Sequence, residues 1–142
     1  MNKLIWTKIK SMKMEYYNTR KISGTSFNEI RTRLETALKK EGFGVLTEID
    51  IQATMKKKLD KDYLPHLILG ACNPVYADKV LSIDPNISTL LPCNVTIREI
   101  ENGDIVVSTI NPEAAMSAIN NPAIEKIARE IQEKLLSVLT NF

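Results

Sequence analysis

The two cysteines of this chain are its residues best suited to nucleophilic or metal-binding chemistry, and an asparagine follows each of them directly. Cys72-Asn73 ends one apolar run and Cys93-Asn94 follows another. A thiolate is a nucleophile and a soft metal ligand, and an amide side chain offers donors and an acceptor. One histidine and no clustered Cys/His pattern argue against a tetrahedral zinc site built within one chain.

The surroundings of each cysteine suggest how the two are brought together. Cys72 ends a predicted strand, and Asn73-Pro74 after it is typical of the start of a helix. A thiol beside a helix amino terminus has a lowered pKa, because partial positive charge favours the thiolate. Cys93 begins the next predicted strand. If the two strands run antiparallel, we expect the two sulfurs to approach each other or to face one pocket.

Polar side chains near these strand ends extend the candidate site. Asn73 and Asn94 are expected to flank the pocket, and Glu48 and Asp50, at the end of another strand, to supply carboxylates to its rim. The predicted ligand-binding residues are Cys72, Asn73, Cys93, Asn94, Glu48 and Asp50. No metal ligands are assigned and no cofactor is identified.

The cysteine pair permits three interpretations. The first is structural, with both thiols as small buried hydrophobic groups, since free cysteine is among the most buried residue types. The second is a reversible thiol–disulfide or reactive-thiol role. The third is binding of a metal or a small ligand, for which His66, Glu48 or a partner chain would have to complete the ligand set.

Five strands and five helices are predicted to position these residues. The strands are expected at 15–23, 45–50, 63–72, 91–99 and 105–110. The first helix begins at Ser26 with a capping box to Glu29 and ends at Gly42. Asp50 caps the second helix, and asparagine-proline pairs start the three others at residues 73, 111 and 121. Asn102-Gly103 is a strong hairpin signal.

Two of these strands alternate in polarity, which predicts the face that each side chain takes. In 91–99, one side carries Cys93, Val95 and Ile97, and the other carries Asn94, Thr96 and Arg98. In 45–50, one side carries Val45, Thr47 and Ile49, and the other carries Leu46, Glu48 and Asp50.

The order of elements predicts an α+β fold, a two-layer sandwich in which helices lie mainly on one face of a mixed sheet of about five strands. Residues 1–14 are expected to be a leader or extension, and 15–142 a single α+β domain. The strand 63–72 is apolar on both faces, so the uncovered face of the sheet is expected to be buried by a second copy, as a homodimer.

Composition and charge narrow the classes of function. The chain has 142 residues, of which 44% are hydrophobic and 25% charged, as in ordinary globular proteins. No apolar run reaches the roughly 20 residues of a transmembrane helix, and no signal-peptide core is present, so we expect a cytoplasmic protein. Residues 1–22 carry a balance of +5 and the rest −3. No basic stripe on the body indicates nucleic-acid binding.

Three segments of the chain resemble the bacterial and archaeal family called domain of unknown function 302. They are residues 42–50 (GFGVLTEID), 69–74 (LGACNP) and 90–95 (LLPCNV), in matching order and spacing. The resemblance covers nearly all of the chain from about Tyr16. It implies a compact α+β fold and dimers, and it implies no reaction.

These observations favour a small binding or accessory domain, dimeric, with a pocket near Cys72 and Cys93. A thiol-dependent redox enzyme that uses the same two cysteines is the alternative. A third hypothesis is attachment to a membrane or nucleic acid through the basic residues 1–14.

Overall fold

The computed structural model describes residues 15–142, so the predicted leader and its attachment role lie outside the described residues. The strands are β1 (Tyr17–Ile22), β2 (Gly44–Asp50), β3 (His66–Cys72), β4 (Cys93–Glu99) and β5 (Ile105–Ile110). The α-helices are α2 (Phe27–Lys40), α3 (Ile51–Leu59), α4 (Pro74–Ile83), α5 (Pro112–Ala115) and α6 (Pro122–Thr140). Two 3-10 helices are η1 (Pro85–Leu90) and η2 (Ser117–Ile119).

The strands form one sheet in the order β1-β5-β4-β3-β2, and every neighbouring pair is antiparallel. The α+β class is confirmed, whereas the predicted mixed sheet is wrong. β1 and β2 are joined by α2 and run in the same direction, but they occupy the two edges of the sheet. Three strands lie between them, so this parallel pair never exchanges hydrogen bonds.

Helix α2 follows the capping and apolar pattern of its sequence. The Ser26 hydroxyl accepts a hydrogen bond from the Glu29 N–H at 3.2 Å. At the other end, Gly42 has φ +86° and the Phe43 N–H donates to the Leu38 carbonyl, which closes the helix. The residues buried on its inner face are Ile30, Leu34, Ala37 and Leu38.

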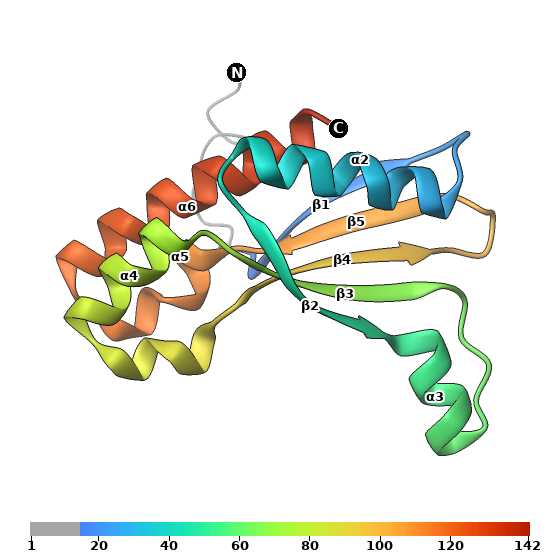
Figure 1. Ribbon diagram of the computed structural model, residues 1–142, viewed down its shortest axis with the longest axis horizontal. Coiled ribbons are helices and arrows are strands. Elements are labelled where there is room, and N and C mark those ends of the chain that lie inside the picture. The colour runs from blue at the N-terminus through green and yellow to red at the C-terminus, as the bar shows by residue number, and fades with distance from the viewer. Residues whose placement is uncertain (1–14) are drawn as a thin grey trace, which may run out of the picture.

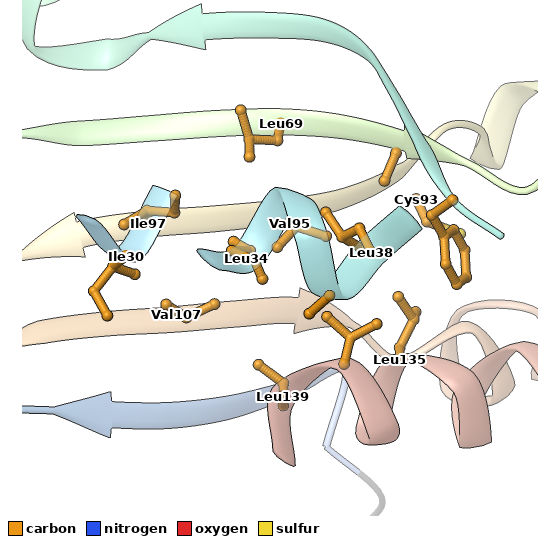
Figure 2. Packing of buried hydrophobic residues seen from close by; sticks show 14 of the residues in the cluster. Ile30, Leu34, Leu38, Leu69, Cys93, Val95, Ile97, Val107, Leu135 and Leu139 are labelled. Carbon is orange, nitrogen blue, oxygen red and sulfur yellow. The ribbon is translucent and has the colours of Figure 1, made fainter. Parts of the chain in front are cut away.

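The main core lies between one face of the sheet and the helices α2 and α6, which gives the predicted two layers (Figure 1). Figure 2 shows Leu69, Val95 and Val107 of three adjacent strands beneath the leucines of α2 and α6. A smaller buried cluster is formed by Val80, Ile87, Met116, Ile124 and Ala128. It packs α4, η1 and α6 together beside the sheet.

The opposite face of the sheet, called here the open face, carries side chains that alternate with those of the core. Cross-strand partners share a face, so the register of the strands fixes its members. They are Tyr17, Thr19, Lys21, Thr47, Ile49, His66, Ile68, Gly70, Asn94, Thr96, Arg98, Val106, Ser108 and Ile110. Exposed side chains on it come from β1, β2 and β4.

Candidate functional site

The two cysteines line one small cavity at the end of β3 and the start of β4. The strands are antiparallel and Cys93 pairs with Ala71, so the strand ends meet as predicted. Tyr76 of α4 and Pro92 complete one side of the cavity, whose volume is about 20 Å³. Both thiols are free. A cavity of this size holds about one water molecule.

The Cys93 thiol belongs to the core. It is 6% exposed and lies in the cluster beneath α2 (Figure 2). Burial, and to a smaller extent the neighbouring Cys72, raise its pKa to about 11. The thiol is therefore protonated at neutral pH, a state that neither attacks electrophiles nor binds metals well. Cys72 is half-buried.

Asn73 occupies the N-cap position of α4, but its side chain makes no capping hydrogen bond. Its amide donates instead to the Glu41 carbonyl at 3.1 Å. Carbonyls at the end of α2 have no partner within that helix, and the amide satisfies one of them. A Cβ on Gly42 would lie 3.0 Å from the Asn73 amide nitrogen, so glycine allows this approach. Asn73 thus ties α4 to the end of α2.

Glu48 and Asp50 are not brought to the cysteine cavity. Cys72 pairs with Gly44 at one end of β2, and Glu48 pairs with Leu69, three residues from Cys72 on β3, which places Glu48 roughly 10 Å away along the sheet. Glu48 accepts two hydrogen bonds from Arg31 at 2.6 and 3.1 Å. The hydrogen bond with Glu48 is the main cause that raises the pKa of Arg31. Asp50 caps α3 by accepting from the Ala53 N–H at 2.9 Å.

Asn94 is separated from the cysteines by the pleat of the sheet. It is exposed and pairs with Gly70 on the open face, whereas Cys93 faces the core. There it lines a hollow of about 490 Å³ that runs over β4, β5 and β1. The expectation that Asn94 flanks the cysteine pocket is therefore wrong.

The lining of this hollow is ordered by the register of three strands. Thr96, Ser108 and Thr19 are cross-strand neighbours and form a row of hydroxyl groups. The Thr19 and Ser108 hydroxyls are 3.1 Å apart and hydrogen-bonded. On one side of this row lie Asn94 and the pair Tyr17–Ile110, and on the other lies Arg98. The hollow therefore has an apolar aromatic end, a hydroxyl centre and a cationic end.

His66, the one histidine of the chain, faces Arg98 across β3 and β4. Burial, and then the positive charge of Arg98, lower its pKa below the ordinary value of 6.5. The imidazole is therefore neutral at pH 7. Among residues 15–142, no three His, Cys, Asp or Glu side chains converge as a metal site would require.

The residues of the hollow other than Asn94 were not assigned to a site from the sequence. The alternation of residues 91–99 does put Asn94, Thr96 and Arg98 on one face, and the structure confirms that face. What the sequence does not state is which strands lie beside β4. Ser108 and Thr19 join the site only through the β4–β5 and β5–β1 pairings.

The fold and site together describe a two-layer α+β domain with an antiparallel sheet and a polar hollow on its open face. The chain belongs to the family described as "Domain of unknown function DUF302", whose model matches residues 18–142. The predicted family is thereby confirmed. Within the described part of the chain, no helix is both long and apolar enough to cross a bilayer.

Two relatives are informative about fold and length. The chain is similar to a crystal structure of an uncharacterized conserved DUF302 protein from Bacillus stearothermophilus, with a TM-score of 0.83 and 32% identity. The match covers 90% of this chain and 98% of that one. It is also 31% identical over 91 residues to an uncharacterized protein of Aquifex aeolicus (strain VF5). That match covers 64% of this chain and 57% of the relative.

Proposed function

We propose that this protein is a small-ligand-binding domain that works as a homodimer, with its ligand in the hollow on the open face. The observation that carries the proposal is the hollow itself, a space of about 490 Å³ where polar side chains of three strands converge. Small-molecule sites commonly have volumes of about 300–1,000 Å³ with a few placed polar groups. Asn94 is the predicted site residue that belongs to it.

The alternative position, between the cysteines, is too small for an organic ligand. Its volume is about 20 Å³ and apolar groups such as Phe43 and Val80 wall it. Cys72, Asn73 and Cys93 then contribute packing and a link between α2 and α4. Glu48 and Asp50 serve in an ion pair and a helix cap.

The homodimer is supported by apolar side chains on the open face. Ile49 and Ile68 are cross-strand neighbours on β2 and β3, and Ile49 is 47% exposed. An antiparallel sheet that meets water on one face usually carries polar side chains there. A second copy on this part of the face would bury both isoleucines, beside a hollow that lies over β4, β5 and β1.

Ligand-observed NMR with a library of small polar compounds tests the binding site. Compounds should bind the wild type and Asn28→Ala, an exposed asparagine on α2, but bind Asn94→Ala more weakly. In spectra of the labelled protein, the backbone amides whose shifts change on binding should lie in β4, β5 and β1. Shifts that cluster at Cys72 and Tyr76, or equal binding to Asn94→Ala, would contradict the proposal.

Light scattering tests the dimer. The wild type should have the mass of two chains, and Ile49→Lys should reduce it to one. Leu136→Lys is the matched control, since Leu136 is 44% exposed on α6, away from the open face. A monomeric wild type, or a dimer that persists in Ile49→Lys, would remove this part of the proposal.

A thiol-dependent redox activity is the second candidate, because both thiols line one cavity. With oxidised glutathione, attack by one thiol and then the other would form a Cys72–Cys93 disulfide and release two glutathione molecules. The glutathione disulfide is reduced and the protein thiols are oxidised. The raised pKa of Cys93 opposes this reaction. Two free thiols after incubation would exclude the redox candidate.

A further inference from the structure

We infer that the ligand of the open-face hollow is a small organic anion, whose carboxylate or phosphate binds Arg98 and whose apolar part lies against Tyr17. This inference rests on the proposed function and names the chemical class of its ligand. It follows from the charges, the hydrogen-bond donors and the apolar groups of the hollow.

The open face carries positive charge only. Arg98 and Lys21 both pair with Val106, so they lie in one row across β4, β5 and β1. None of the strand residues that form this face is Asp or Glu. Residues 15–142 have 15 basic and 17 acidic side chains, so this face departs from the average charge.

Arg98 has a guanidinium available for a ligand. Arg31, Arg33 and Arg129 each pair with a glutamate. Arg20 donates to the Leu139 and Phe142 carbonyls at 2.8 and 2.9 Å. Among residues 15–142, no carboxylate lies within 4.0 Å of Arg98, the distance that defines an ion pair.

Two carboxylates lie near Arg98 on its other side. Asp62 and Glu99 line a neighbouring hollow together with Arg98. Asp62 pairs with Lys56 at 3.1 Å, and Glu99 follows Arg98 on β4 and therefore alternates to the other face. Neither carboxylate occupies the hollow that Asn94 lines.

The other groups of the hollow complement the rest of such a ligand. The Thr96 and Ser108 hydroxyls provide donors for anion oxygens beside Arg98, and the Asn94 amide offers a further polar group at the far end of the hollow. Tyr16 and Tyr17 pack edge to face at 4.8 Å and form the aromatic end. Arg98 is four residues from Asn94, roughly 13 Å along the strand, so one small molecule can reach from the cation toward the aromatic wall.

Amide-shift titrations with three probes test this inference: phenyl phosphate, 3-phenylpropionate and neutral 3-phenylpropanol. Both anions should shift the amides of Thr96, Arg98 and Ser108. The anion that binds more tightly shows whether the site prefers a phosphate or a carboxylate. Arg98→Gln should weaken the anions about tenfold or more, whereas Arg129→Gln should not. Arg98→Lys keeps the positive charge but loses the planar guanidinium that can donate two parallel hydrogen bonds. We therefore expect its affinity for the anions to lie between those of the wild type and Arg98→Gln.

Two results separate failure of the inference from failure of the site. If the alcohol shifts the same amides as strongly as the anions, and Arg98→Gln changes nothing, the anion class is wrong and the hollow remains the site. If all three probes shift amides elsewhere, the proposed function is wrong as well. For the wild type, affinity for the anions should fall as salt rises, and salt-independent affinity would contradict the inference.

Discussion

Cys93 and Asn94 are adjacent in the chain and lie on opposite faces of the sheet. Cys93 pairs with Ala71 and faces the core, whereas Asn94 pairs with Gly70 and faces the hollow. Because successive side chains of a strand point to opposite faces, Cys93 packs in the core and Asn94 belongs to the candidate site. Changes at Cys93 should therefore alter stability, and changes at Asn94 should alter binding.

Stability should depend on the ionisation of Cys93 at alkaline pH. Its pKa rises from the ordinary 9.0 to about 11 in the folded chain. Below pH 9 the thiol is protonated in both states, so its contribution is fully present. Between the two values only the unfolded chain loses the proton, and the free energy of unfolding should fall by about 2–3 kcal/mol as pH rises.

Urea unfolding at several pH values measures this fall in the free energy of unfolding. Cys93→Ala should remove that part of the slope between the two pKa values, whereas Cys72→Ala should retain most of it. An identical slope in wild type and Cys93→Ala would contradict the assignment of the slope to Cys93.

Gly70 should not tolerate a side chain. A Cβ there would meet the Thr47 hydroxyl and would lie 2.8 Å from the Pro92 Cγ. We expect Gly70→Ala to destabilise the fold by about 1–3 kcal/mol through overpacking. Gly44→Ala is the control, since a Cβ at Gly44 meets nothing within 4 Å. Equal midpoints of urea unfolding for the two variants would show that Thr47 and Pro92 do not fill this position.

The amides of Asn18 and Gln132 should contribute to stability as a pair. Each donates to the other, at 2.8 and 2.7 Å, and this joins β1 to α6. Gln132 is 8% exposed, so Asn18→Ala leaves its amide without a partner at a cost of about 1–3 kcal/mol. The double variant Asn18→Leu, Gln132→Leu should lose less than the sum of the single variants. Additive losses in a double-mutant cycle would show that the two amides act independently.

His66 reports on Arg98 because it is the single histidine of the chain. Its proton NMR titration should have a midpoint below 6.5, the ordinary value, owing to burial and to Arg98. Because the folded chain favours neutral imidazole, this contribution to stability is present above 6.5 and is lost as pH falls. Arg98→Gln should move the midpoint upward in part, and an unchanged midpoint would show that the charge of Arg98 does not reach His66.

The local patterns of the sequence predict most elements of the fold. Ser26 and Asp50 cap helices as expected, and Gly103, at φ +86°, lies in the predicted hairpin between β4 and β5. These features depend on neighbours in the chain. Pairing between strands that are distant in the chain does not depend on such neighbours. The order of strands and the antiparallel sheet therefore follow only from the structure.

A β-bulge explains why the predicted faces of the side chains in β2 are partly wrong. The strict alternation predicted for residues 45–50 puts Val45 and Thr47 on one side. The register shifts between them, so Val45 packs on the core while Thr47 lies on the open face. Leu46, in the bulge, is 67% exposed. A single inserted residue of this kind leaves no clear mark in polarity.

The candidate site was predicted in part for a similar reason. The two sulfurs are expected to approach only if β3 and β4 run antiparallel; the strands do so, and the two cysteines line one cavity. The size of that cavity, and the partners that hold Asn73 and Glu48, depend on side-chain packing. Those partners are the Glu41 carbonyl and Arg31, and neither is adjacent in sequence.

A crystal of the wild type soaked with phenyl phosphate gives the most direct test of the central claim, that the open-face hollow is the binding site. We predict difference density beside Arg98, Thr96 and Ser108, with the phenyl ring toward Tyr17, and none in a crystal of Arg98→Gln. Density beside Cys72 and Tyr76 instead, or an empty hollow at saturating probe, would contradict the account.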